Sequence, residues 1–139
     1  MNFIVDASFA LAWVLKDEST AKTDEILDSL ARGARAFVPA LWRWEIANTL
    51  LSVERRKRAT SIEVGRHLRL LQTYPIEVDE AGIQQAWTAT HMLAQKYRLT
   101  SYDSAYLELA VRRGLPLATL DAALQTAAKT EKVEVFAGT

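Results

Sequence analysis

The sequence predicts an α/β fold, a three-layer α/β/α domain around a central parallel sheet of about five short strands. Short apolar runs alternate with segments of helical periodicity along the whole chain, which is the pattern of successive βα units. No Asn-Gly or Asp-Gly dipeptide offers a tight hairpin between neighbouring strands. The 139 residues contain no repeat and no Pro/Gly/Ser-rich linker, so residues 1–139 are expected to form one domain.

The elements of the first half are delimited by capping and breaking residues. Ser19 and Thr20 precede a run with helical spacing that Gly33 follows. Thr60 and Glu63 have the spacing of a capping box. The elements expected here are a strand over Asn2–Val5, a helix over Ala7–Leu15, a helix over Ala21–Arg32, a strand over Ala36–Val38 before Pro39, an amphipathic helix over Leu41–Arg58 and a helix from Thr60 to about Thr73.

The second half is divided in the same way, with Pro75 ending one helix and Gly114 another. The elements expected here are strands over Ile76–Val78, Leu115–Thr119 and Val133–Phe136, and helices over Ala81–Tyr97, Tyr102–Arg113 and Asp121–Lys129. The apolar stripe of the helix over Ala81–Tyr97 is expected on or near Ile83, Ala86, Trp87, Met92 and Leu93.

The composition excludes several classes of function. There is no cysteine, which excludes disulfides, thiol catalysis, Fe–S clusters and zinc–thiolate sites. The two histidines, His67 and His91, are too few for a histidine-rich metal site and are expected to be structural or exposed. Seventeen basic and seventeen acidic residues balance, so overall charge favours neither nucleic acid nor membrane binding. With no secretory signal or membrane-spanning pattern, we expect a cytoplasmic protein.

Four acidic residues stand where a parallel sheet binds its ligands, beyond the carboxyl ends of the strands. Asp6 follows the first expected strand and Asp121 follows the fourth. Asp103 lies at the start of the helix that precedes the fourth strand. Glu45 lies inside the long helix on a turn rich in apolar residues, so its carboxylate should face the sheet or its edge. These acids are the candidates for a shared site.

Each acid also has a simpler structural interpretation. Asp6 and Asp121 fit helix N-caps, Asp103 fits a first-turn acid, and a lysine or arginine could pair with Glu45. If the four instead converge, two carboxylates about 4 Å apart repel by roughly 4 kcal/mol at an effective dielectric near 20, so the cluster needs a counter-cation. Oxygen ligands alone select a hard ion such as Mg²⁺ or Mn²⁺, and such ions support hydrolysis of phosphodiesters.

These motifs make the sequence similar to a known family, the PIN-domain ribonucleases, and within it to the toxins of VapBC-type toxin–antitoxin pairs. The resemblance spans nearly the whole chain and rests on Val5-Asp6-Ala7-Ser8, Glu45 with Asn48, Asp103-Ser104-Ala105-Tyr106 and Ala118-Thr119-Leu120-Asp121, in this order. It implies a PIN-like fold and an endoribonuclease that depends on Mg²⁺ or Mn²⁺. It also implies a cognate antitoxin and favours a homodimer.

The resemblance places the metal-binding and catalytic acids at Asp6, Glu45, Asp103 and Asp121. Three of them, Asp6, Asp103 and Asp121, would hold a metal directly or through water, with Glu45 as a ligand or as the base that orients the attacking water. Ser8 and Thr119 match polar positions that support these acids, and Asn48 matches the family's asparagine one turn beyond the glutamate. One or two ions remain possible.

Basic and aromatic residues allow further contacts. Residues 32–58 hold seven basic and two acidic residues, a local excess of five. The run Arg55–Arg58 fits the cation preference of a helix C-terminus, whereas contact with RNA phosphates would involve Arg43, Arg55 and Arg56. The tryptophans at 13, 42, 44 and 87 are expected in the core or at an interface rather than stacked on bases. Apolar surface on the helices Phe9–Leu15 and Leu41–Val53 would serve a dimer or an antitoxin peptide.

Other functions fit the sequence less well. A phospho-acceptor receiver domain needs a second acid after the first strand and a lysine after the fifth, and both are absent. A haloacid-dehalogenase-like phosphatase needs Asp-x-Asp, and the chain has Asp6-Ala7-Ser8. A PIN-fold binding module without catalytic activity stays the main alternative to the nuclease.

Overall fold

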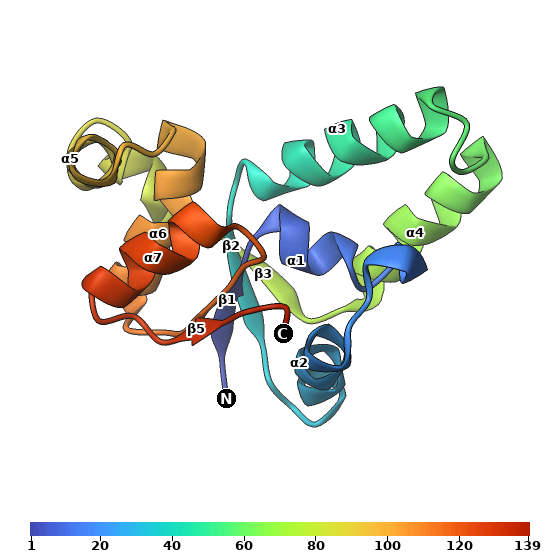
Figure 1. Ribbon diagram of the computed structural model, residues 1–139, viewed down its shortest axis with the longest axis horizontal. Helices are drawn as coiled ribbons and strands as arrows, with labels where there is room; N and C mark the ends of the chain where they lie inside the picture. Colours follow the sequence, from blue (N-terminus) through green and yellow to red (C-terminus); the bar gives the residue numbers. More distant parts are fainter.

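A computed structural model describes residues 1–139 and places a five-stranded sheet between helical layers (Figure 1). The strands are β1 (Phe3–Val5), β2 (Ala36–Pro39), β3 (Ile76–Asp79), β4 (Leu117–Ala118) and β5 (Val135–Phe136). They lie in the order β3-β2-β1-β4-β5, and every neighbouring pair is parallel. This arrangement confirms the predicted three-layer α/β/α fold.

Seven α-helices and two short 3-10 helices connect the strands. They are α1 (Ala7–Leu11), η1 (Lys16–Glu18), α2 (Ala21–Ala31), α3 (Trp42–Arg55), α4 (Ser61–Thr73), η2 (Ala81–Gln85), α5 (Ala89–Tyr97), α6 (Ser101–Arg113) and α7 (Ala122–Thr130). In Figure 1, α1 and α2 lie on one side of the sheet and α5, α6 and α7 on the other, while α3 and α4 form a hairpin that projects away from it. None of the helices combines the length and apolar character that crossing a membrane requires.

Local sequence signals fix several helix ends as predicted. The capping box between Thr60 and Glu63 is formed in both directions at the start of α4. Gly114 ends α6 with a φ of +63°, a left-handed conformation that suits glycine. The predicted helix Leu41–Arg58 instead ends at Arg55, because the chain turns there and Lys57 adopts a left-handed φ of +59°.

The predicted helix over Ala7–Leu15 is too long. Beyond Leu11 the backbone tightens, and the N–H groups of residues 12, 13 and 14 donate to carbonyls three residues back. This tighter turn carries Trp13 into the core, where its indole N–H donates to the Thr23 carbonyl at 3.0 Å. Tertiary packing of one large side chain therefore overrides the helical spacing of the sequence.

The predicted helix over Ala81–Tyr97 is also wrong, because it is two elements. The carboxylate of Asp79 accepts a hydrogen bond from the Gly82 N–H at 2.8 Å and starts the 3-10 helix η2. The chain then breaks at Thr88, whose φ of −119° and ψ of −98° are not helical, before α5 begins. The expected apolar stripe is not buried either, since Trp87 is 94% exposed and Ile83 and Met92 are exposed as well.

The core is centred on β1 and α6. Phe3, Ile4 and Val5 are fully buried, and they share one apolar cluster with Leu107 and Leu109. Of the four tryptophans, Trp13 and Trp42 are buried as expected for core residues, whereas Trp44 and Trp87 are exposed. The sheet is thus covered on both faces, as its near-continuous apolar strands require.

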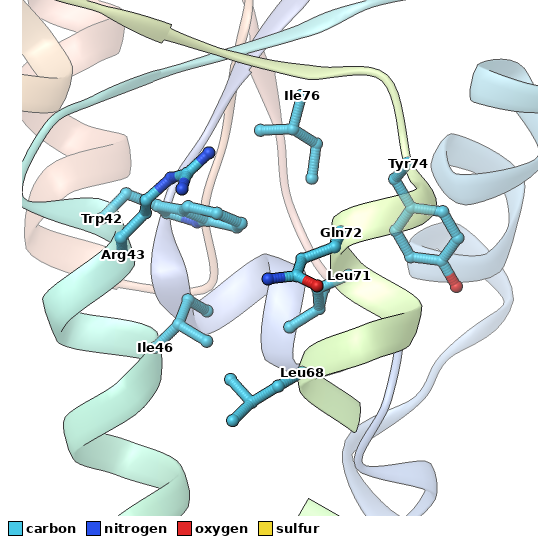
Figure 2. A pocket seen from close by; sticks show the side chains of 8 residues that line it. All are labelled: Trp42, Arg43, Ile46, Leu68, Leu71, Gln72, Tyr74 and Ile76. Atoms are coloured by element: carbon cyan, nitrogen blue, oxygen red, sulfur yellow. The ribbon is translucent and has the colours of Figure 1, made fainter. Parts of the chain in front are cut away.

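The α3–α4 cleft is an apolar hollow of about 400 Å³ between the two helices of the projecting hairpin (Figure 2). Trp42 and Ile46 of α3 face Leu68 and Leu71 of α4 across it, and Ile76 of β3 closes one end. The indole nitrogen of Trp42 is buried and has no hydrogen-bond partner. Six of the eight lining residues are hydrophobic, so the cleft leaves apolar surface open to solvent.

The strand order places a switch point between β1 and β4. From β1 the chain proceeds outward through β2 and β3, and it later returns to the other side of β1 for β4 and β5. Val5 pairs with Ala118 at the carboxyl ends of these two strands. A crevice at such a switch point is where open parallel sheets bind their ligands.

Candidate active site

Asp6 begins the site at the carboxyl end of β1 and is almost completely buried. One carboxylate oxygen accepts the Phe9 N–H at 2.9 Å, which caps α1, and the Ser8 hydroxyl at 2.7 Å. The other oxygen accepts the Thr119 hydroxyl from the end of β4. Burial raises the pKa of Asp6, the three hydrogen bonds oppose that rise, and the charge of Asp103 adds to it.

A small hydrogen-bond network ties the ends of β1 and β4 together. The Thr119 hydroxyl accepts the Asp121 N–H at 3.0 Å, and the Ser8 hydroxyl accepts the Leu120 N–H at 3.2 Å. Asp121 in turn caps α7, since its carboxylate accepts the N–H groups of Ala123 and Leu124. Asp6 and Asp121 are therefore helix caps, as the simpler interpretation expected, and they are also joined to each other through Thr119.

Asp103 lies in the first turn of α6 and is half-buried. Its backbone N–H donates to the hydroxyl of Thr100, the N-cap residue, at 3.0 Å. Burial raises the pKa of the Asp103 carboxyl, and the charge of Asp121 raises it further. The Asp103 carboxylate forms no ion pair with a basic side chain.

Glu45 projects from α3 and is half-buried. Its carboxylate accepts a hydrogen bond from the hydroxyl of Tyr106, which is buried in α6. Burial raises the pKa of Glu45, the Tyr106 hydrogen bond opposes this, and the charges of Asp103 and Asp6 raise it further. Burial and the adjacent Glu45 carboxylate together raise the pKa of Tyr106 far above its usual range, so the phenol stays protonated and donates.

Tyr106 was given no site role from the sequence, although it is the last residue of the motif Asp103-Ser104-Ala105-Tyr106. It stands three positions after Asp103, a spacing that puts two side chains on neighbouring parts of one helix face. That spacing was the available signal, but Glu45, its partner, lies 61 positions away in the sequence. The lysine or arginine that was considered as a partner for Glu45 is not there, because no ion pair involves this residue.

The four predicted acids act on one another electrostatically. Asp6, Glu45 and Asp103 are coupled by repulsion, and Asp121 is coupled to Asp103. None of the four forms an ion pair with a basic side chain. As the side chains lie here, no three His, Asp or Glu residues form a closed set of metal ligands. The donors are nevertheless all carboxylate or hydroxyl oxygens, a chemistry that suits Mg²⁺ or Mn²⁺.

The other predicted residues lie at different distances from the acids. Asn48 is exposed and shares a surface pocket with Glu45. Arg43 is exposed at the α3–α4 cleft. Arg55 and Arg56 are exposed at the far end of α3, and the helical rise puts Arg55 roughly 15 Å from Glu45 along the axis. His67 is half-buried and His91 is exposed, and neither belongs to the site.

The fold is similar to those of several solved proteins. PAE2754 from Pyrobaculum aerophilum gives a TM-score of 0.70 at 24% identity, over 97% of this chain and 83% of that one. VapBC2 from Rickettsia felis, solved with a DNA fragment from its promoter, gives a TM-score of 0.67 at 10% identity, over 97% of both chains. FitAcB from Neisseria gonorrhoeae gives a TM-score of 0.66 at 17% identity, over 99% of this chain and 98% of that one. At these identities the likeness shows the fold alone.

Sequence comparison gives the family itself. A comparison with curated proteins found no significant match. The family model of the PIN domain, in contrast, matches residues 3–130, which run from the start of β1 to the end of α7 and include all four acids. On that match the chain belongs to the PIN domain family.

Proposed function

We propose that the protein is a metal-dependent endoribonuclease that hydrolyses RNA phosphodiesters and acts as the toxin of a toxin–antitoxin pair. The observation that carries this proposal is the position of Asp6 and Asp121 after the adjoining strands β1 and β4, with Asp103 and Glu45 on the helices α6 and α3. Three of them have a raised pKa, and none has a basic partner. Burial is the main cause of these raised pKa values and repulsion between the acids adds to it, so the ionised carboxylates cost stability unless a cation is bound. The arrangement therefore favours a cation-binding function over a structural one.

In this proposal Asp6, Asp103 and Asp121 hold Mg²⁺ or Mn²⁺ directly or through water. A bound divalent ion would lower the pKa of a water molecule and stabilise negative charge on the phosphate. Glu45 is a metal ligand or accepts a proton from the attacking water. The Tyr106 hydroxyl orients the Glu45 carboxylate by donating a hydrogen bond to it. Ser8 and Thr119 hold the Asp6 carboxylate in place from two elements.

The basic residues have a separate role in the proposal. Arg43, Arg55 and Arg56 are exposed and belong to no ion pair, so their charges are available to RNA phosphates. All three lie on or directly after α3, the helix that carries Glu45. RNA would therefore run along this helix toward the acids.

Two apolar surfaces support the proposed protein partners. The exposed side chains of Ile83, Trp87 and Met92 on η2, α5 and the segment between them would form the interface of a homodimer. The α3–α4 cleft would take an apolar segment of a cognate antitoxin, since its walls are mainly hydrophobic and open to solvent.

The proposed activity is tested with a labelled single-stranded RNA in Mg²⁺, in Mn²⁺ and in EDTA. We expect the wild type to cleave with either metal and not with EDTA. Asp6→Asn and Asp103→Asn should lose at least about a hundredfold in rate, because each removes a charge from the acidic set. Asp28→Asn, an exposed acid on α2, is the matched control and should cleave like the wild type.

Two results would count against this function. Equal cleavage by the wild type and both site variants would reject the proposed role of the acids. RNA binding without cleavage in any metal would favour the alternative, a PIN-fold module that binds but does not hydrolyse. Thermal melting gives an independent readout. Added Mn²⁺ should raise the melting temperature of the wild type more than that of Asp6→Asn, because the variant has lost a ligand for the ion.

A further inference from the structure

Two exposed aromatic side chains directly precede two acids of the site. Trp44, next to Glu45 on α3, is 72% exposed, and Tyr102, next to Asp103 on α6, is 65% exposed. Both line the same surface pocket of about 420 Å³, which also contains Glu45. Both also line a neighbouring hollow of about 410 Å³ that extends toward η2. The two rings therefore come together from separate helices at the edge of the site.

The packing of the protein does not account for these two side chains. Trp13 and Trp42 are buried, and the indole N–H of Trp13 is satisfied by a backbone carbonyl. Trp44 and Tyr102 leave most of their rings in water, where large apolar groups are unfavourable. Their shared position suggests a ligand that covers aromatic rings.

The chemistry of the shared pocket defines that ligand. Among its lining residues there is no lysine or arginine, and the polar ones are Glu45 and Asn48. A phosphate here would meet a carboxylate and no cation, so the pocket disfavours the RNA backbone. A neutral planar group fits better, because its faces can stack on aromatic rings and the Asn48 amide can donate to and accept from its polar edge.

We propose that Trp44 and Tyr102 form a stacking surface for an unpaired nucleobase of the substrate, next to the phosphodiester that is cut. This inference rests on the proposed nuclease function and goes beyond it by assigning two aromatic residues of this chain to contact with a base. A base can stack on a side chain only when it is not already stacked in a duplex. The substrate at this site is therefore single-stranded RNA.

The test is equilibrium binding of a fluorescein-labelled unpaired RNA of about a dozen nucleotides, in EDTA so that no cleavage occurs. The same strand annealed to its complement is measured in parallel. Trp44→Ala and Tyr102→Ala should each weaken binding of the unpaired strand about tenfold, and should not change binding of the duplex. Trp44→Phe and Tyr102→Phe keep a stacking ring and should retain most of the affinity.

Ile62→Ala is the control, because Ile62 of α4 is 66% exposed, lines neither hollow and has no part in the proposed site or interfaces. It should bind unpaired RNA like the wild type. Under cleavage conditions, Trp44→Ala should raise KM while kcat stays close to its wild-type value. Because the replaced side chains are exposed, melting temperatures should not move, and this shows that a loss of binding is not unfolding.

Three outcomes would overturn the inference. One is unchanged affinity in Trp44→Ala and Tyr102→Ala. Another is an equal loss in Ile62→Ala. The third is a change of Trp44→Ala from a dimer to a monomer that fully explains its weaker RNA binding. In that case the surface of Trp44 and Tyr102 would be a contact between copies of this chain. If the wild type neither binds nor cleaves RNA, the proposed function fails first, and all variants are then equally inactive.

Discussion

At the scale of single residues, Asp6 is the acid most constrained by its surroundings, and it lends itself to a stability experiment. Its folded-state pKa is raised mainly by burial, so ionisation at neutral pH costs the folded state free energy. This contribution favours folding below the unfolded pKa of about 3.9 and is lost as pH rises through the higher folded pKa. The folded protein without a divalent ion is thus less stable at pH 7 than its packing alone would allow.

We therefore predict that Asp6→Asn raises the free energy of unfolding at pH 7 in EDTA, because the amide removes a carboxylate whose ionisation is opposed by burial. The amide can still accept from the Ser8 hydroxyl and the Phe9 N–H. The gain should shrink as pH falls through the raised folded pKa and should be absent below the unfolded pKa of about 3.9, where the aspartate is protonated in both states. Urea titrations at several pH values measure it, with Asp28→Asn as the exposed control. A less stable Asp6→Asn at pH 7 would contradict the prediction.

The sequence predicted the near neighbours in this site better than the distant ones. Asp6 and Ser8 are two positions apart, and parallel pairing of β1 with β4 brings Thr119 beside them. In contrast, the contact between Glu45 and Tyr106 depends on how α3 and α6 cross above the sheet. No local spacing encodes such a crossing, because it follows from packing of the whole core.

At the scale of elements, a partly buried ionic group joins β3 to α6. Asp79 ends β3 with only 2% of its side chain exposed, and it accepts bonds from Arg112 at 2.7 and 3.2 Å and from Arg113 at 3.2 Å. Glu108, one turn earlier on α6, accepts a further bond from Arg112 at 2.7 Å. The hydrogen bond from Arg112 lowers the pKa of Asp79, so its carboxylate stabilises the fold above its unfolded pKa.

We predict that Asp79→Asn lowers the free energy of unfolding by about 3 kcal/mol at pH 7, since it leaves Arg112 without one of its charged partners. The loss should diminish at acid pH, because the wild-type contribution disappears as pH falls through the lowered folded pKa. Glu77→Gln breaks the exposed pair of Arg35 and Glu77 and should cost less than about 1 kcal/mol. Similar losses in the two variants, measured by urea unfolding, would be inconsistent with a buried role for Asp79.

The same aspartate shows why one element could not be predicted. The helical spacing of residues 81–97 is a property of the sequence, but the chain enters this segment as a 3-10 helix in which the Gly82 N–H donates to the Asp79 carboxylate. The helix signals that did hold, at Thr20 and at Thr60, involve residues three positions apart. Helix ends that depend on such local hydrogen bonds can be predicted from the sequence. Helix ends that depend on a side chain bonded to a distant element cannot.

At the scale of the whole molecule, the strand order decides where function can reside. Alternating elements predict a parallel sheet, but several strand orders satisfy the same alternation. The order β3-β2-β1-β4-β5 puts the ends of β1 and β4 side by side at the switch point. Asp6 and the backbone N–H of Asp121 are linked there through the Thr119 hydroxyl although the two aspartates are far apart in sequence, while α3 and α6 carry the other two acids.

None of the four acids lines the α3–α4 cleft. Toxicity and its neutralisation by an antitoxin can therefore be tested with separate substitutions. Leu68 lines the cleft and is 37% exposed, whereas Leu70 on the same helix is 41% exposed and does not line it. A charge at Leu68 should therefore block an apolar antitoxin segment without touching the acids. The same charge at Leu70 has a similar cost to folding and should leave the cleft open.

We predict that expression of the wild type arrests growth of a bacterial host, that Asp103→Asn does not, and that Leu68→Arg and Leu70→Arg both do. Co-expression of the antitoxin, sought in the short reading frame beside this gene, should restore growth to cells with the wild type or Leu70→Arg and fail with Leu68→Arg. Growth curves measure both effects. Rescue of Leu68→Arg as complete as that of Leu70→Arg would exclude the α3–α4 cleft as the antitoxin site and leave the acidic edge of the sheet, or the surface of Ile83, Trp87 and Met92, as the place where neutralisation occurs.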